Sequence, residues 1–176
     1  MQFLNKKEYS LSNLRENIEL TIYSFLVFFV PFFMHQNQLF VGIIVNMSLV
    51  LAALNLKSWK ILPLIVLPSA AVLSRGLLFG TFTPFLLYMM PFIWIGNTML
   101  IIFIKKLYVE NRFNQLLSLA IGSISKAGFL FMVAFLFVNV NILPVLFLTS
   151  MGIIQFYTAI AGGLLAFSIN HIKNKF

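Results

Sequence analysis

The sequence predicts an all-α membrane protein with six transmembrane helices. Of its 176 residues, 61% are hydrophobic and only 9% are charged, and the mean hydropathy is +0.99. A water-soluble domain of this length needs a polar surface, and this composition is too apolar to supply one. The apolar residues form long runs separated by short polar clusters, which is typical of a polytopic helical membrane protein. The length suits a single integral membrane domain over residues 1–176.

Six apolar segments are long enough to cross a hydrocarbon layer of ~30 Å at about 1.5 Å per helical residue. The predicted spans cover approximately residues 18–34, 39–55, 61–79, 84–104, 115–139 and 144–170. Residues 1–17 precede the first span and contain several charged side chains, and Leu11, Leu14 and Ile18 recur at helical spacing. We expect this segment to be an amphipathic lead-in that lies on the membrane surface.

The third span is predicted to be the most irregular. Pro63 and Pro68 lie inside it, and each removes a backbone hydrogen bond and favours a kink. The sequence "RGLLFGTFTPF" at 75–85 then contains two glycines and is predicted to be a partly re-entrant connection. The fourth span carries one internal proline, Pro91.

The last two spans contain the most informative residues. Lys126 lies near the middle of the fifth span, with no acidic residue within ten positions on either side. In the sixth span, "QFYTAIAGGLLAF" at 155–167 places glycine and alanine along one stripe of a helix. Small residues four apart allow helices to approach closely. We favour packing within this chain for that stripe, and docking to another membrane subunit is the alternative.

The basic residues lie in alternate connections and so predict the orientation of the chain. Lysine or arginine occurs in the lead-in, in "LKSWK" after the second span, in "KKLYVENRFN" after the fourth, and in the C-terminal tail. The connections "HQNQ", "GTFT" and "NVNILP" carry none, although Arg75 lies shortly before "GTFT". By the positive-inside rule, both termini are predicted to be cytoplasmic in a multi-pass protein of the plasma membrane.

Polar side chains in four different spans are predicted to lie at similar depth. Counting from the start of each span places Lys126, Asn97 and Gln155 roughly 16 to 20 Å into the membrane, and Asn46 lies at a comparable level. A charge at the bilayer centre costs ~2.5–3.5 kcal/mol even on lenient scales. Lys126 therefore needs a stabilising environment.

Three interpretations of Lys126 are open. It is a structural group, neutral or bonded to helix carbonyls and to Asn97 or Gln155; or it is a ligand-facing amine in a water-accessible cavity; or it snorkels toward the interface. The second is favoured. The chain has no aspartate, and its four glutamates lie near predicted cytoplasmic ends of spans: Glu8, Glu16, Glu19 and Glu110. An autonomous proton-driven transporter, which normally uses a buried acid, is thus disfavoured, and an anionic or electronegative ligand suits Lys126 best.

Two further residues are candidates for a ligand site. Trp94 precedes Asn97 by three positions and shares its helix face, so it is either a packing or interface residue or a stacking platform for a ligand. Arg75 lies close to the outer interface and is either an interfacial anchor or a ligand clamp. The sequence has no cysteine and no motif of a catalytic, ATP, metal or nucleic-acid site. We therefore expect no enzyme activity, cofactor or metal.

Several stretches resemble the substrate-binding S components of energy-coupling factor (ECF) importers: "VGIIVNMSLVLAAL" (41–54), "LPSAAVLSRGLLFG" (67–80), "MPFIWIGN" (90–97), "SKAGFLF" (125–131) and "QFYTAIAGG" (155–163). The resemblance covers nearly the whole chain. It implies a membrane receptor for a vitamin or metal, with an outer pocket built mainly from the last three spans. The implied pocket residues are Asn97, Lys126, Gln155 and Thr158. The implied partners are a transmembrane coupling subunit and two cytoplasmic ATPases.

One feature departs from that family. Its coupling surface often uses an alanine motif in the first span, and "IELTIYSFLVFFVPFFM" at 18–34 contains no alanine. Small residues of the second, third or sixth span would have to substitute. The rival hypothesis is a structural membrane scaffold that resembles the rod-shape protein family. A scaffold predicts a dry, satisfied polar cluster at Lys126, whereas a receptor predicts a cavity that reaches Lys126 from outside.

Overall fold

The computed structural model describes residues 13–34, 37–75 and 80–173, and in these ranges the chain is helical with no strand. The prediction of an all-helical chain is confirmed. The elements in chain order are α1 (Asn13–Phe33), α2 (Gln38–Asn55), the 3-10 helix η1 (Ser58–Ile61), α3 (Leu62–Arg75), the 3-10 helix η2 (Gly80–Phe85), α4 (Leu86–Phe103), the π-helix η3 (Ile104–Glu110), α5 (Gln115–Asn139), α6 (Leu146–Met151) and α7 (Ile153–Lys173).

Five helical stretches are long and apolar enough to cross a membrane, which fits a multi-pass membrane protein. They contain α1, α2, α4, α5 and the α6–α7 pair. The helix of the third predicted span, α3, has only 14 residues and is not among them. Pro63 stands at its second position and Pro68 in its interior. The irregularity expected of this span therefore takes the form of a short α-helix extended by η1.

The boundaries of the other elements differ from the predicted spans in three places. α1 already begins at Asn13, so residues 13–17 continue into the first spanning helix; residues 1–12 lie outside the described chain. Of the predicted re-entrant segment, residues 76–79 are likewise not described, and η2 leads into α4. The sixth span is broken at Gly152, where a Cβ atom would meet the Leu148 carbonyl oxygen at 2.8 Å.

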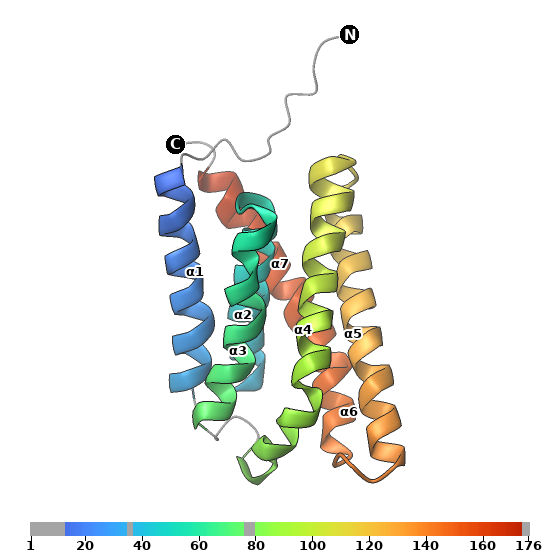
Figure 1. Ribbon diagram of the computed structural model, residues 1–176. Coiled ribbons are helices and arrows are strands. Elements are labelled where there is room, and N and C mark those ends of the chain that lie inside the picture. The colour runs from blue at the N-terminus through green and yellow to red at the C-terminus, as the bar shows by residue number, and fades with distance from the viewer. Residues whose placement is uncertain (1–12, 35–36, 76–79, 174–176) are drawn as a thin grey trace.

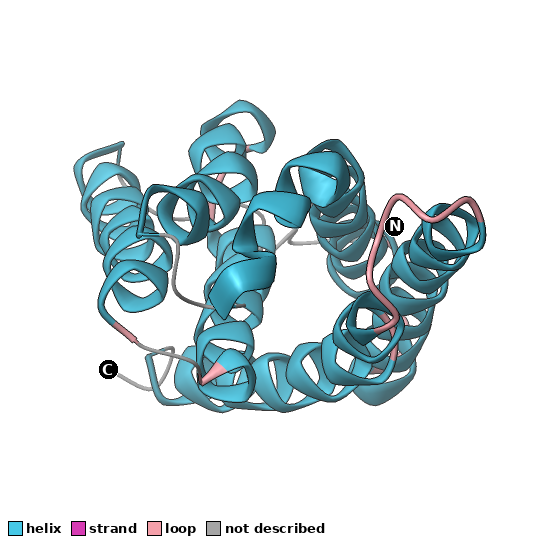
Figure 2. Ribbon diagram, turned by 90° about the horizontal axis from the view of Figure 1, so that it is seen from below, coloured by secondary structure: helices cyan, strands magenta, loops and turns pink. Residues whose placement is uncertain are grey.

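The helices form one bundle with α2 and α7 in the middle, between α1 on one side and α4 and α5 on the other (Figure 1). α3 lies in front of α2 in this view and contacts both α1 and α4, and α1 begins at the same end of the bundle at which α7 ends. The view along the bundle shows the helices side by side around its long axis (Figure 2). α2 packs most extensively against α7, and nearly all its side chains from Val45 to Leu54 are buried.

Glycines bring α2 and α7 into close contact. A Cβ atom at Gly162 of α7 would lie 2.5 Å from the Ile43 carbonyl oxygen and 2.7 Å from the Met47 nitrogen, both backbone atoms of α2. At Gly42 of α2, a Cβ would lie 2.8 Å from the side chain of Thr158 on α7. Part of the small-residue stripe of α7 thus packs within this chain, which is the interpretation that we favoured.

An ionic network joins α1 to the rest of the bundle at the end where α7 terminates. Glu16 is 1% exposed and accepts hydrogen bonds from the Lys57 backbone nitrogen (2.7 Å) and the Lys60 ammonium (2.8 Å). Glu19 accepts from the Tyr23 hydroxyl at 2.9 Å and pairs with Lys173 at the end of α7. These bonds link α1, η1 and α7, and α1 contacts mainly α2 and α3 through its apolar residues. We call this network the end cluster.

The close contact at Gly162 gives a stability prediction. Gly162→Ala places a methyl group against backbone atoms that cannot rotate away, so α2 and α7 must separate; we expect a loss of about 1–3 kcal/mol. Reversible unfolding in mixed detergent micelles measures it. Gly128→Ala in α5 is the matched control, because its Cβ meets nothing within 4 Å and alanine has the higher helix propensity. Equal stability of the two variants would show that the α2–α7 contact is looser than described.

Candidate functional site

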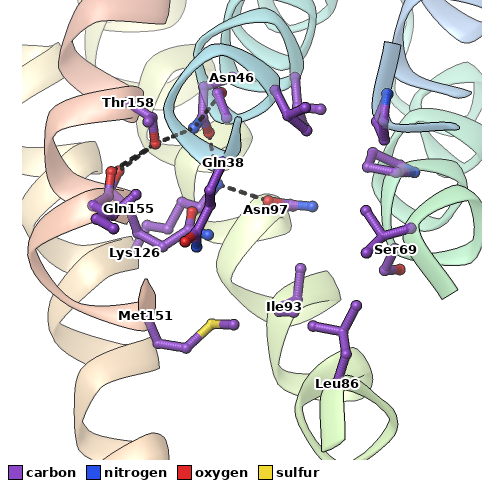
Figure 3. A pocket seen from close by; sticks show the side chains of 17 residues that line it. Gln38, Asn46, Ser69, Leu86, Ile93, Asn97, Lys126, Met151, Gln155 and Thr158 are labelled. Atoms are coloured by element: carbon purple, nitrogen blue, oxygen red, sulfur yellow. Dashed lines mark hydrogen bonds between the residues drawn. The ribbon is translucent and has the colours of Figure 1, made fainter. Parts of the chain in front are cut away.

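Lys126 is buried in the centre of the bundle and bonded to two asparagines. Its side chain leaves α5, and the residue is 2% exposed. Nζ donates to Oδ1 of Asn46 on α2 at 2.6 Å and to Oδ1 of Asn97 on α4 at 2.8 Å (Figure 3). Counting depth along the spans placed these three residues at one level, and the structure brings them into contact. Snorkelling of Lys126 toward the interface is therefore wrong.

Both asparagine amides are oriented by their other bonds. An amine can donate to an amide oxygen, so Lys126 fixes which end of each amide faces it. The Nδ2 of Asn46 donates to the Gly42 carbonyl at 2.9 Å and to the Thr158 hydroxyl at 3.1 Å. The Nδ2 of Asn97 donates to the Ile65 carbonyl of α3 at 3.3 Å. The Lys126 cluster, by which we mean Lys126, Asn46, Asn97 and Thr158, thus connects five helices.

A cavity of about 80 Å³ reaches this cluster. Among the described residues that line it, Lys126 is the one ionisable side chain; the others are Pro31, Gln38, Val41, Gly42, Val45, Asn46, Pro68, Ser69, Val72, Leu86, Ile93, Asn97, Met151, Ile154, Gln155 and Thr158. A volume of roughly 10–15 Å³ is enough for one water molecule, so the cavity has room for several waters or a compact ligand. The Lys126 cluster is therefore not enclosed by packed side chains on every side.

The lining has a polar and an apolar part. Thr158, Gln155 and Asn46 lie near Lys126, whereas Met151, Ile93 and Leu86 lie together farther along the cavity (Figure 3). Leu86 begins α4 and Met151 ends α6, and both belong to the end of the bundle opposite to the end cluster (Figure 1). The cavity thus extends from the Lys126 cluster toward that end.

Hydrogen bonds between α2 and α6 lie at the same end of the cavity. Gln38, the first residue of α2, donates from Nε2 to the Ser150 carbonyl at 3.4 Å and accepts from the Ser150 hydroxyl at 3.2 Å. The sequence analysis did not single out either residue, because both lie in short polar stretches at helix ends. Their separation of 112 positions leaves no local signal of the contact.

The remaining candidates are placed differently. Gln155 lines the cavity and is half-buried. Trp94 contacts the site indirectly: its Nε1 donates to the hydroxyl of Ser69 at 2.8 Å, and Ser69 lines the cavity. Arg75 ends α3, and its side chain lies outside the described structure. The resemblance implied a pocket mainly of the last three spans, but α2 and α3 contribute to this cavity as well.

The side chains around the cavity can bind a ligand through hydrogen bonds and apolar contacts. In the described part of the chain, histidine, cysteine, aspartate and glutamate do not gather in groups of three or more that could hold a metal ion. The cavity offers hydrogen bonds from an amine and amides together with an apolar wall. Comparison with family models, with curated proteins and with solved structures finds no match for this chain. Function is therefore inferred from the cavity and from the sequence itself.

The bonds of the Lys126 cluster can be measured by a double-mutant cycle. Asn97→Leu removes an acceptor from a buried amine at nearly constant volume, and Lys126→Met removes the donor. We expect a coupling of about 0.5–1.5 kcal/mol in the free energy of unfolding, because each single change leaves one hydrogen bond of the other side chain unmade, while Lys126 keeps its bond to Asn46.

The control for this cycle pairs Lys126→Met with Ser168→Ala. Ser168 is exposed on α7 and bonds only locally, to the Leu164 carbonyl. These two changes are expected to be additive within about 0.5 kcal/mol. Additivity of Lys126→Met with Asn97→Leu as well would mean that their hydrogen bond contributes nothing to stability.

Proposed function

We propose that this protein is the substrate-binding membrane subunit of an ATP-driven importer of the ECF type, which captures a small nutrient from outside the cell. The observation that carries the proposal is the cavity that reaches Lys126 within an otherwise apolar helical bundle. A polar cluster that served only to join helices would need no cavity beside it. The sequence resemblance to S components supports the same function.

The proposed topology has six crossings, with both termini in the cytoplasm of a plasma-membrane protein. α3 is too short by itself, but η1 continues directly into it. Four residues of 3-10 helix and 14 of α-helix extend roughly 29 Å, which matches a hydrocarbon layer of ~30 Å. α1 begins and α7 ends at the same end of the bundle, as an even number of crossings requires (Figure 1).

The proposed importer requires partner subunits. The sequence contains no ATP-binding motif, so the energy for transport would come from two cytoplasmic ATPases through a transmembrane coupling subunit. The first span lacks the alanine motif that S components often use for docking. In the structure α1 instead presents large apolar side chains, with Ile22, Phe25 and Phe33 all exposed. The coupling subunit would therefore meet an aromatic rather than a small-residue surface, or dock elsewhere.

The proposal predicts a bound ligand that depends on Lys126. Native mass spectrometry of the protein purified in mild detergent is expected to show a stoichiometric small molecule, which solvent extraction then identifies. Lys126→Met should lose it, because the mutation removes the amine from the cavity. Lys106→Met is the control: it removes one positive charge from an exposed position in η3 and should retain the ligand.

The alternative function is a structural scaffold of a cell-envelope complex. One observation favours it: the amine of Lys126 already bonds to two amide oxygens within the chain. A scaffold predicts no co-purifying ligand and no effect of added small molecules on thermal stability. It also predicts that Lys126→Met disrupts a protein assembly in cells while nutrient uptake is unchanged. That combination would contradict the importer proposal.

The proposed topology can be tested by cysteine labelling, because the chain has no cysteine of its own. Val140 lies in the turn after α5 and Asn111 directly after η3, and both are exposed. In intact cells or spheroplasts, a membrane-impermeant maleimide is expected to label Val140→Cys. Asn111→Cys should react only after lysis, because it is predicted to be cytoplasmic. The reverse pattern would invert the orientation, and labelling of both in intact cells would contradict the predicted crossing by α5.

A further inference from the structure

The hydrogen bonds inside the cavity leave N–H donors that a ligand could use. An ammonium group has three N–H donors, and two of those on Lys126 are used by Asn46 and Asn97. Asn46 uses both of its own N–H groups, on Gly42 and Thr158. Asn97 uses one, on Ile65, and has a second. In the protonated form of Lys126, one N–H of its ammonium group and one of Asn97 therefore have no partner among the described residues.

The acceptor oxygens of the cluster each already receive one hydrogen bond from within the chain and have one lone pair left. The side-chain oxygens of Asn46 and Asn97 face the Lys126 amine. The Thr158 hydroxyl accepts from Asn46 and donates to the Ile154 and Gln155 carbonyls of its own helix. A ligand that needs to donate hydrogen bonds would share these oxygens with donors of the chain, with the Gln155 amide the one flexible exception.

The lining of the cavity is also uneven in its ionisable groups, because the described residues include a basic side chain and no acidic one. Of the chain's four glutamates, Glu16 and Glu19 are bound in the end cluster, and Glu110 ends η3. The two groups bonded to Nζ of Lys126 are neutral amide oxygens, which carry no compensating charge. Among the described residues, the lining therefore supplies no anion to balance a protonated Lys126.

The shape of the cavity limits what can neutralise that group. Beyond the polar part, the walls are mostly apolar, and Gln38 and Ser69 are the polar side chains among them; the apolar ones are Val41, Val45, Val72, Leu86, Ile93, Met151 and Ile154, with Pro31 and Pro68. A second charge on a ligand would be buried against these side chains without a partner, which is strongly unfavourable. This argues against a phosphate ester, a dicarboxylate, a cation or a zwitterion.

We infer that the ligand is a compact monocarboxylate with an apolar body. Its carboxylate would accept the remaining N–H of Lys126 and that of Asn97, and its body would lie against Ile93, Met151 and Leu86. Charge-assisted bonds of this kind are about twice as strong as neutral ones. The inference rests on the proposed function, in that it takes the cavity to be a ligand site, and it adds the chemical class of the substrate.

Trp94 provides a reporter for the test, since its indole bonds to Ser69 in the cavity wall. The chain has two tryptophans, so Trp59→Phe leaves Trp94 as the single one. In this background the fluorescence is titrated with isobutyrate and benzoate, and with the neutral isosteres isobutyramide and benzamide. Benzylamine and phthalate represent a cation and a dianion of similar size. We expect a carboxylate to bind at least tenfold more tightly than its amide, and neither benzylamine nor phthalate to bind better than benzoate.

Two variants test whether Lys126 is the cause. Lys126→Met should abolish the preference for carboxylate over amide, and Lys106→Met should retain it. Because Lys126→Met could fail to fold, Asn97→Asp is the second variant. It keeps the shape and the bond to Nζ but supplies a carboxylate from the protein, and so should also abolish the preference. A preference that survives in folded Lys126→Met or Asn97→Asp would overturn the inference.

The ligand extracted from the purified protein shows whether this inference alone fails or whether the proposed function fails with it. A stoichiometric monocarboxylate in the extract supports the inference even where both probes are too small to bind. A neutral, cationic or multiply charged ligand, or amides that bind as tightly as their acids, would overturn the monocarboxylate class and leave the importer proposal standing. If no ligand is extracted and no probe binds, both are overturned.

Discussion

The structure depends on one constraint: the amine of Lys126 lies among apolar helices and must be solvated by other side chains. Hydrocarbon offers no hydrogen bonds, and the chain has no carboxylate near this level. Two asparagine oxygens from α2 and α4 do this instead, at 2.6 and 2.8 Å. Asn46 reaches the amine while it is also held by Thr158 of α7. That contact requires α2 and α7 to touch, which glycine at position 42 allows. The close packing of α2 on α7 and the hydrogen bonds of Lys126 at the centre of the bundle therefore depend on each other.

The end cluster differs from the Lys126 cluster in that its charged groups are paired with each other. The end cluster pairs Glu16 with Lys60 and Glu19 with Lys173, so each buried carboxylate has a cationic partner. It joins the start of α1 to η1 and to the end of α7, where helices would otherwise fray. Lys126 has no such partner at the centre. The chain thus places its ion pairs at the end that is predicted to be cytoplasmic and leaves one cation without a counter-charge beside a cavity. The two clusters thus differ in whether their basic groups are paired with carboxylates among the described residues.

Much of the site could be predicted from the sequence because depth in a membrane is nearly a linear count of residues. A rise of about 1.5 Å per residue was enough to place Lys126, Asn97 and Asn46 at one level, and they are in contact. The same count could not show which helices are neighbours, so the role of Thr158 in holding Asn46 emerged only from the fold. The end cluster was missed because its pairs are 44 and 154 positions apart. The break at Gly152 was missed for a different reason: one glycine in an apolar run is compatible with a continuous helix.

A structural cluster and a ligand site are not alternatives in this geometry. The asparagine oxygens that bond to Lys126 fix the direction of its amine, and they leave its charge uncompensated because they are dipoles rather than anions. A bound anion would therefore gain the full benefit of an amine that is already oriented, without the entropy cost of ordering a free lysine side chain. The bond from Asn97 to the Ile65 carbonyl likewise holds that amide in place, so its orientation is also fixed before a ligand binds. The bonds that make Lys126 tolerable in an empty bundle are thus the ones that prepare it for an anionic ligand.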